Sequence, residues 1–193
     1  MKNDLSEEKT YNKIDFHESP LAKDDYENCR FLSCNFSKVD LNEIHFIDST
    51  FQGCNMNTTN FLKTSLINIQ FKDCKLIGVF FDHCNPFGLS VSFDNCTLTY
   101  SSFFKIRLKK TSFKNSNLRN VDFTESDLSN SIFDNCDLTD AIIKDAILEK
   151  ADFRTSFGFS IDPAINKIKR AKFGLSGLPG LLDSYDLDID INS

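Results

Sequence analysis

The chain has 193 residues, of which 40% are hydrophobic, enough for one domain with a core, and a net charge of −6. An acidic chain with a pI of about 5.1 argues against direct nucleic-acid binding through a basic face. No run of about 18 apolar residues is present, so we expect no membrane-spanning helix.

Residues 1–12 are interpreted as an N-terminal tail or cap. They contain no apolar segment of the kind found in secretory signals, so we expect a cytoplasmic protein with reduced thiols. Acidic residues are concentrated in this part of the chain. Residues 1–50 contain 11 acids and 6 bases, a net charge of −5.

Residues 13–173 carry a five-residue repeat. Every fifth residue from Phe31 to Phe81 is large and apolar, and the same spacing returns, displaced by two residues, from Phe93 to Phe153. A small or β-branched residue precedes each centre by two positions. Five residues match neither the helical nor the strand period, so the chain must turn a corner every five residues.

The segments SNLRN, SDLSN and CDLTD resemble the pentapeptide-repeat motif, and the resemblance covers about residues 14–157. The family implies an all-β fold, a right-handed quadrilateral β-helix in which four pentapeptides form one coil of 20 residues. We expect about seven coils with a continuous core column. Its members are Phe31, Phe51, Phe71, Phe93, Phe113, Phe133 and Phe153.

The seven cysteines all fall on the small inward position and are interpreted as buried, structural thiols rather than a metal or redox site. His17, His45 and His83 fall on outward positions in different columns. No catalytic triad, phosphate-binding loop or metal-ligand spacing is present. We therefore expect no catalytic residues, no metal and no cofactor, and a protein that is not an enzyme.

Two outward columns are interpreted as structural ladders. Lys72, Asp94, Lys114, Asp134 and Arg154 alternate in sign and predict ion pairs between coils. Asn95, Asn115 and Asn135 predict side-chain hydrogen bonds. The basic residues between Lys105 and Arg119 spread over several faces and are interpreted as part of a mixed, solvated surface.

The repeat slips by two residues near 84–92, where Pro86 takes a centre position and Gly88 favours a turn. This segment is either an accommodated insertion or a projecting contact for a partner. The candidate contact residues are Asn85, Pro86, Phe87 and Gly88.

Residues 174–193 have a different pattern. LPGLLDSY predicts a short helix, and DLDIDI alternates as a strand does. The two elements would cover the exposed end of the phenylalanine column and leave an apolar face that suits a two-fold partner. A homodimer is preferred to a monomeric cap, and the candidate interface residues are Leu178, Leu181, Leu182, Tyr185, Leu187 and Ile189.

This ending resembles that of Qnr-type quinolone-resistance proteins, which have an Asp-Pro pair, a leucine-rich helix and a terminal strand in this order. The resemblance implies a DNA-mimicking rod that binds DNA gyrase or topoisomerase IV and confers quinolone resistance. The alternative is a protein-interaction scaffold with an unrelated partner. A continuous acidic stripe would favour mimicry, and a patchwork of charges would favour the scaffold.

Overall fold

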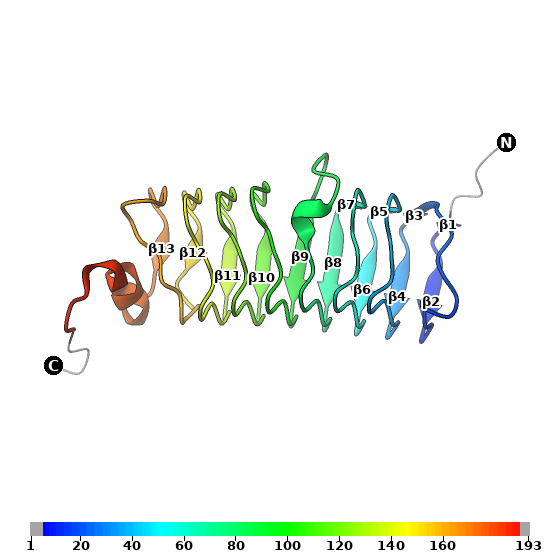
Figure 1. Ribbon diagram of the computed structural model, residues 1–193, viewed down its shortest axis with the longest axis horizontal. Helices are drawn as coiled ribbons and strands as arrows, with labels where there is room; N and C mark the ends of the chain where they lie inside the picture. Colours follow the sequence, from blue (N-terminus) through cyan, green and yellow to red (C-terminus); the bar gives the residue numbers. More distant parts are fainter. Residues whose placement is uncertain (1–5, 190–193) are drawn as a thin grey trace.

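The computed structural model describes residues 6–189 as a solenoid of about eight turns, closed at its C-terminal end by a short helical segment (Figure 1). It has the right-handed quadrilateral β-helix fold that the repeat predicts. Within the described residues, parallel strands form one sheet of nine and one of four. The remaining faces are joined by isolated bridges such as Asn35↔Asn55 and Asp122↔Ile142.

The larger sheet runs the length of the rod, and its strands pair in register one coil apart. In order they are β2 (Thr10–Asn12), β4 (Arg30–Leu32), β6 (Thr50–Gln52), β8 (Ile69–Lys72), β9 (Val91–Asp94), β10 (Ser112–Lys114), β11 (Ile132–Asp134), β12 (Asp152–Phe153) and β13 (Lys172–Phe173). The smaller sheet contains β1 (Ser6–Glu7), β3 (Asp25–Glu27), β5 (His45–Ile47) and β7 (Ser65–Ile67).

The solenoid begins earlier than the sequence analysis placed it. Strands β1 and β2 lie within residues 1–12, which the sequence assigned to a tail or cap, yet they pair with β3 and β4. The ring of Tyr11 stacks on that of Phe31 with centroids 4.8 Å apart. The first coil departs from the repeat consensus, but its backbone and Tyr11 still fit the neighbouring coil.

Most corners of the described solenoid contain a residue in the left-handed helical region. In the middle of the rod these residues recur every five positions, for example Asn115, Asn120 and Glu125, with φ values of 48°, 56° and 57°. This conformation costs about 1 kcal/mol for a residue other than glycine, least for Asn and Asp. The corner backbone N–H donates to the next coil, as Asn115 N does to Asp134 O at 2.8 Å, which offsets the cost.

The core column consists of stacked phenylalanine rings. All seven residues of the predicted column are at most 1% exposed. Neighbouring rings are nearly parallel, as for Phe113 and Phe133, whose centroids lie 4.9 Å apart at 6°. The column extends beyond the predicted range to Tyr11 at one end and Phe173 at the other. It contacts a second column edge-on, which includes Phe103 and Phe123.

The two-residue slip is present in the strand register. Phe71 pairs with Phe93 across a step of 22 residues, whereas Phe51 pairs with Phe71 across 20. The extra residues follow a short 3-10 helix, η1 (Phe81–His83), and form the loop that projects from the rod between β8 and β9 (Figure 1).

The C-terminal segment differs from the predicted helix and strand. It forms two 3-10 helices, η2 (Leu175–Leu181) and η3 (Asp183–Tyr185). Pro179 lacks an N–H and Gly177 and Gly180 are poor α-helix formers, which explains the tighter turns. Residues 187–189 form no strand, because a strand needs a hydrogen-bonded neighbour that this single chain does not place there. The rest of the predicted strand lies outside the described residues.

Candidate interaction surfaces

The C-terminal helices cap the column and leave apolar side chains uncovered. Phe159 packs on the rings of Phe153 and Phe173, and η2 lies over it. Gly180 approaches Phe159 so closely that a Cβ would collide with its carbonyl oxygen. The carbonyl of Gly180 accepts a hydrogen bond from Ile161 N at 2.8 Å. The cap is therefore attached to the last coil through backbone contacts that require glycine.

Five of the six predicted dimer-interface residues are exposed. The exposed fraction is 37% for Leu182 and 58% for Leu187, and Leu178, Tyr185 and Ile189 lie between these values. Leu181 differs because it is partly buried and packs against the core, and its place in a dimer interface stays a prediction. Sequence reasoning missed Leu175, which is 85% exposed.

These side chains border a groove at the end of the rod. Its lining includes Leu175, Leu178, Pro179, Leu182 and Ile189, with Arg154 at one side. An apolar groove of this kind on the surface of a small domain is typical of an interaction site. The C-terminal end therefore presents a group of exposed apolar side chains around a groove.

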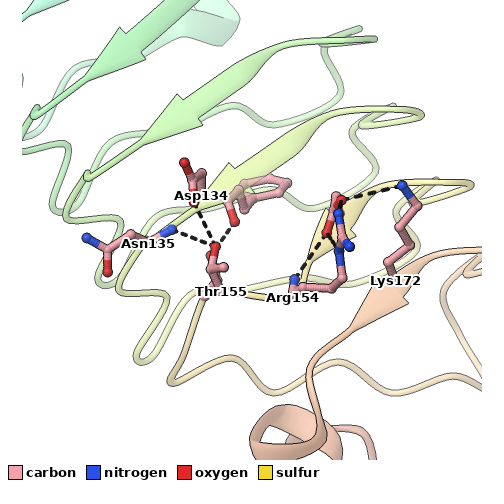
Figure 2. Close-up of polar contacts among 8 residues, drawn as sticks. Asp134, Asn135, Arg154, Thr155 and Lys172 are labelled. Atoms are coloured by element: carbon pink, nitrogen blue, oxygen red, sulfur yellow. Dashed lines mark hydrogen bonds and ion pairs between the residues drawn. The ribbon is translucent and has the colours of Figure 1, made fainter.

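Polar contacts beside this groove hold the last coils together (Figure 2). Asp152 accepts hydrogen bonds from Arg154, whose Nη2 lies 2.7 Å from Asp152 Oδ2, and Lys172 Nζ lies 3.5 Å from the same oxygen. The Arg154 hydrogen bond lowers the pKa of Asp152 to about 2, against the opposing effect of partial desolvation. Arg154 and Lys172 thus bridge two coils through one carboxylate.

The predicted charge ladder along Lys72, Asp94, Lys114, Asp134 and Arg154 does not form ion pairs within residues 6–189. Instead Asp94 accepts from Asn115 Nδ2 at 3.2 Å, and Asp134 accepts from Thr155 Oγ1 at 2.9 Å (Figure 2). Both carboxylates therefore accept hydrogen bonds from uncharged side chains of the neighbouring column instead of pairing with a cation of their own column. Of the predicted asparagine ladder, the link from Asn135 to Asn115 is present at 3.0 Å.

Ion pairs form on another column and across neighbouring columns. Glu43 lies between Lys23 and Lys63, and Lys105 Nζ is 3.2 Å from Glu125. Lys109 pairs with Asp127 and Arg119 with Asp137. Three of the six basic residues from Lys105 to Arg119 thus pair with acidic residues, in keeping with a mixed surface. In the column of Lys23, Glu43, Lys63, Lys105 and Glu125, basic side chains interrupt the acidic ones.

The slipped segment is exposed but ordered by local hydrogen bonds. Phe87 is 85% exposed, and its backbone N–H is bonded to Asn85 Oδ1 at 3.1 Å. Asn85 also donates to Ser65 Oγ, and Gly88 adopts φ +75° against Ile67. Asn85, Pro86, Phe87 and Gly88 thus present one aromatic side chain on a defined turn.

Reactive groups do not converge in residues 6–189. No cluster of three or more His, Cys, Asp or Glu side chains there could hold a metal ion. All seven cysteines are buried and unbridged, and desolvation raises the pKa of Cys136 to about 12. In the inward column Cys54 and Cys74 donate to carbonyl oxygens of the preceding coil, each at 3.3 Å. None of the described helices has the length and apolarity that membrane crossing requires.

Solved structures with a similar fold include that of full-length QnrB1, a plasmid-mediated fluoroquinolone resistance protein. It is 15% identical, and the match covers 94% of this chain and 99% of QnrB1 with a TM-score of 0.58. A trypsin-treated variant of QnrB1 matches with 18% identity, 95% and 99% coverage and a TM-score of 0.51. HetL from the cyanobacterium Nostoc sp. strain PCC 7120 has 15% identity, 89% coverage of both chains and a TM-score of 0.39.

We found no match among curated protein sequences. The family model for the pentapeptide repeat region matches residues 24–86 and 89–157, and the two matched segments are separated at the register slip. These segments cover more than half of the chain, and the five-residue spacing, the phenylalanine columns and the square coils agree with them. The chain belongs to the pentapeptide-repeat family.

Proposed function

We propose that this protein is a non-enzymatic rod that binds a type II topoisomerase, DNA gyrase or topoisomerase IV, and protects it from quinolones. The observation that carries the proposal is the whole-length similarity in fold to QnrB1, a fluoroquinolone resistance protein. The proposed partner is a cytoplasmic enzyme, so the proposal includes a cytoplasmic location, with no membrane or direct nucleic-acid contact by this chain.

Binding to a DNA-binding saddle requires negative charge on a rod of suitable width. The acidic excess lies in residues 1–50, with a net charge of −5. If the rod dimerises through its C-terminal end, these acidic coils become the two distal arms. Mimicry would then depend on the arms and on shape, because the middle coils carry paired charges.

The homodimer is part of the same proposal, and the exposed leucines at the C-terminal groove support it. Charge adds to this argument, because Asp183, Asp186 and Asp188 lie on the terminal segment while Lys169 and Arg170 are exposed on the last coil. A two-fold arrangement would let each acidic segment approach the basic coil of the other copy.

The dimer is tested by sedimentation equilibrium of Leu182→Asp, with Ile142→Asp as the matched control. Both side chains are partly exposed, at 37% and 45%, but Ile142 lies away from the groove. We expect Leu182→Asp to be monomeric and Ile142→Asp to remain dimeric. A monomeric wild type, or a dimeric Leu182→Asp, would contradict the interface.

The function is tested by a gyrase supercoiling assay in the presence of a quinolone, with purified protein titrated in. Restored supercoiling would support protection. Inhibition of supercoiling would indicate binding by mimicry without protection. No effect at micromolar protein would refute the topoisomerase proposal.

The alternating charges favour a second candidate, an interaction scaffold with an unrelated protein partner. Ion pairs such as Lys105–Glu125 and Lys109–Asp127 interrupt any continuous acidic face. The scaffold becomes the working proposal if gyrase is unaffected while the dimer is intact.

A further inference from the structure

One face of the solenoid carries a group of apolar side chains at outward positions that are polar in neighbouring coils. Phe80 is 52% exposed and Leu62 is 42% exposed. Phe80 pairs with Ser102 in the next coil, and the same ladder continues to Asp122. The rod core does not need these side chains, because Phe61, Phe81 and Phe103 fill the inward positions of the same coils.

Asp82 lies within this group, in the outward column between Leu62 and Phe104. We call the surface formed by Leu62, Phe80, Asp82, His83 and Phe104 the Asp82 patch. Asp82 and His83 of this patch belong to η1, directly before the projecting loop that carries Phe87 (Figure 1). The ring of His83 stacks on that of Phe80 with centroids 5.3 Å apart.

The carboxylate of Asp82 is poorly satisfied. Its Oδ1 is buried without a hydrogen-bond partner, a situation that among the described side chains it shares only with Asn42 Oδ1 of the same column. Its Oδ2 lies 3.8 Å from His83 Nε2, which is too long for a hydrogen bond. A covered carboxylate oxygen without a donor destabilises the folded protein, because it gives up hydrogen bonds to water without replacing them.

The lysines next to the patch already form ion pairs with other residues. Lys63 pairs with Glu43, and Lys105 pairs with Glu125. The Lys105 ammonium also lies 4.8 Å from the ring centre of Phe104, so an aromatic face of this patch already accepts a cation. Apart from His83, whose charge depends on protonation, Asp82 is left as the unneutralised charge of the patch.

An arginine side chain could contact the aromatic rings, the Asp82 carboxylate and the apolar side chains of the patch at the same time. Its planar guanidinium stacks on aromatic rings, its N–H groups bind a carboxylate in pairs, and its stem covers apolar surface. Rotation of the Asp82 carboxylate about Cβ–Cγ, a soft torsion, would turn Oδ1 toward the incoming group. Lysine would supply the charge but not the planar contact.

We propose that the Asp82 patch docks a partner protein through an arginine flanked by apolar residues. This site goes beyond the proposed function, since it does not depend on which protein the rod binds. It would also give the buried Oδ1 of Asp82 a hydrogen-bond donor that the free protein lacks.

The test is a titration of the full chain with the peptide acetyl-Phe-Arg-Phe-amide, followed by backbone amide NMR shifts. The control peptide replaces arginine with citrulline, which keeps the planar shape but removes the charge. We expect saturable shifts at Leu62, Asp82 and His83 with a dissociation constant on the order of 1 mM, and binding weaker by at least about fivefold for citrulline. Equal binding of both peptides, or no saturable shift, would overturn the proposal.

Two variants make the result specific. Asp82→Asn should weaken binding of the arginine peptide by at least about fivefold, whereas Asp122→Asn on the same face should leave it unchanged. Because Asp82 Oδ1 is buried without a hydrogen-bond partner in the free protein, Asp82→Asn should also unfold at the same urea concentration or a higher one. A large loss of stability would mean that Asp82 has a structural role, and unchanged peptide binding would refute the site.

Discussion

Replacing Phe113 by alanine tests the stacked core most directly. Phe113 is 0% exposed and stacks on Phe93 and Phe133 with centroids 5.2 and 4.9 Å away. It also meets Phe103 and Phe123 edge-on. A phenylalanine buries at least about 150 Å², so at about 25 cal/mol per Å² its removal costs about 4 kcal/mol. The loss of ring contacts and the cavity give an expected range of about 3–5 kcal/mol.

The measurement is urea unfolding followed by far-ultraviolet circular dichroism, because the chain has no tryptophan to report unfolding by fluorescence. Phe113→Leu keeps most of the volume and should cost less than about 1.5 kcal/mol. Phe173→Ala, at the partly exposed end of the column, should cost less than Phe113→Ala. A loss below about 1 kcal/mol for Phe113→Ala would refute the stacked-coil reasoning, since no collapse of the rigid ladder could fill so large a cavity.

Three further predictions concern the last coils and the thiols. The lowered pKa of Asp152 means that its contacts stabilise the fold above about pH 4 and are lost as the pH falls toward about 2. In urea unfolding the advantage of wild type over Asp152→Asn, at most about 1 kcal/mol after solvent screening, should therefore disappear at pH 2, and a constant difference would contradict it. Gly180→Ala should destabilise the cap by about 1–3 kcal/mol through collision with Phe159, with Ser176→Ala as a tolerated control in thermal unfolding. All seven cysteines should resist Ellman's reagent at pH 8 until guanidinium is added, because they are buried, and fast native labelling would argue against the inward positions.

The coil, its core and its interruption could be predicted because they depend on spacing along the chain. A phenylalanine every 20 residues can be buried repeatedly only if coils stack, and the structure shows Phe51 paired with Phe71 in that register. The two-residue displacement is visible in the same spacing and reappears as the step from Phe71 to Phe93. Pro86 and Gly88 mark its position, because proline restricts the backbone and glycine allows conformations that other residues rarely adopt.

One group of predictions that failed concerns contacts between side chains of neighbouring coils. Column membership placed Asp94 beside Lys114, but the orientation of the side chains directs Asp94 to Asn115. The buried, unpartnered Oδ1 of Asp82 could not be predicted, because the burial of one atom depends on side-chain packing that the repeat spacing does not fix. The sequence feature closest to a signal is the order of this outward column, in which Asp82 stands between the apolar residues Leu62 and Phe104 of the coils on either side.

The sequence by itself determined the period, the inward and outward positions and the place of the slip, because a hydrophobic pattern with a fixed step allows one register. Only the tertiary structure decided where the rod begins and how it ends. Tyr11 joins the column although its coil lacks the consensus, since a neighbouring ring is already in place. The C-terminal segment forms 3-10 turns over Phe159, because the fit of Gly180 against that residue outweighs the helical pattern of the leucines.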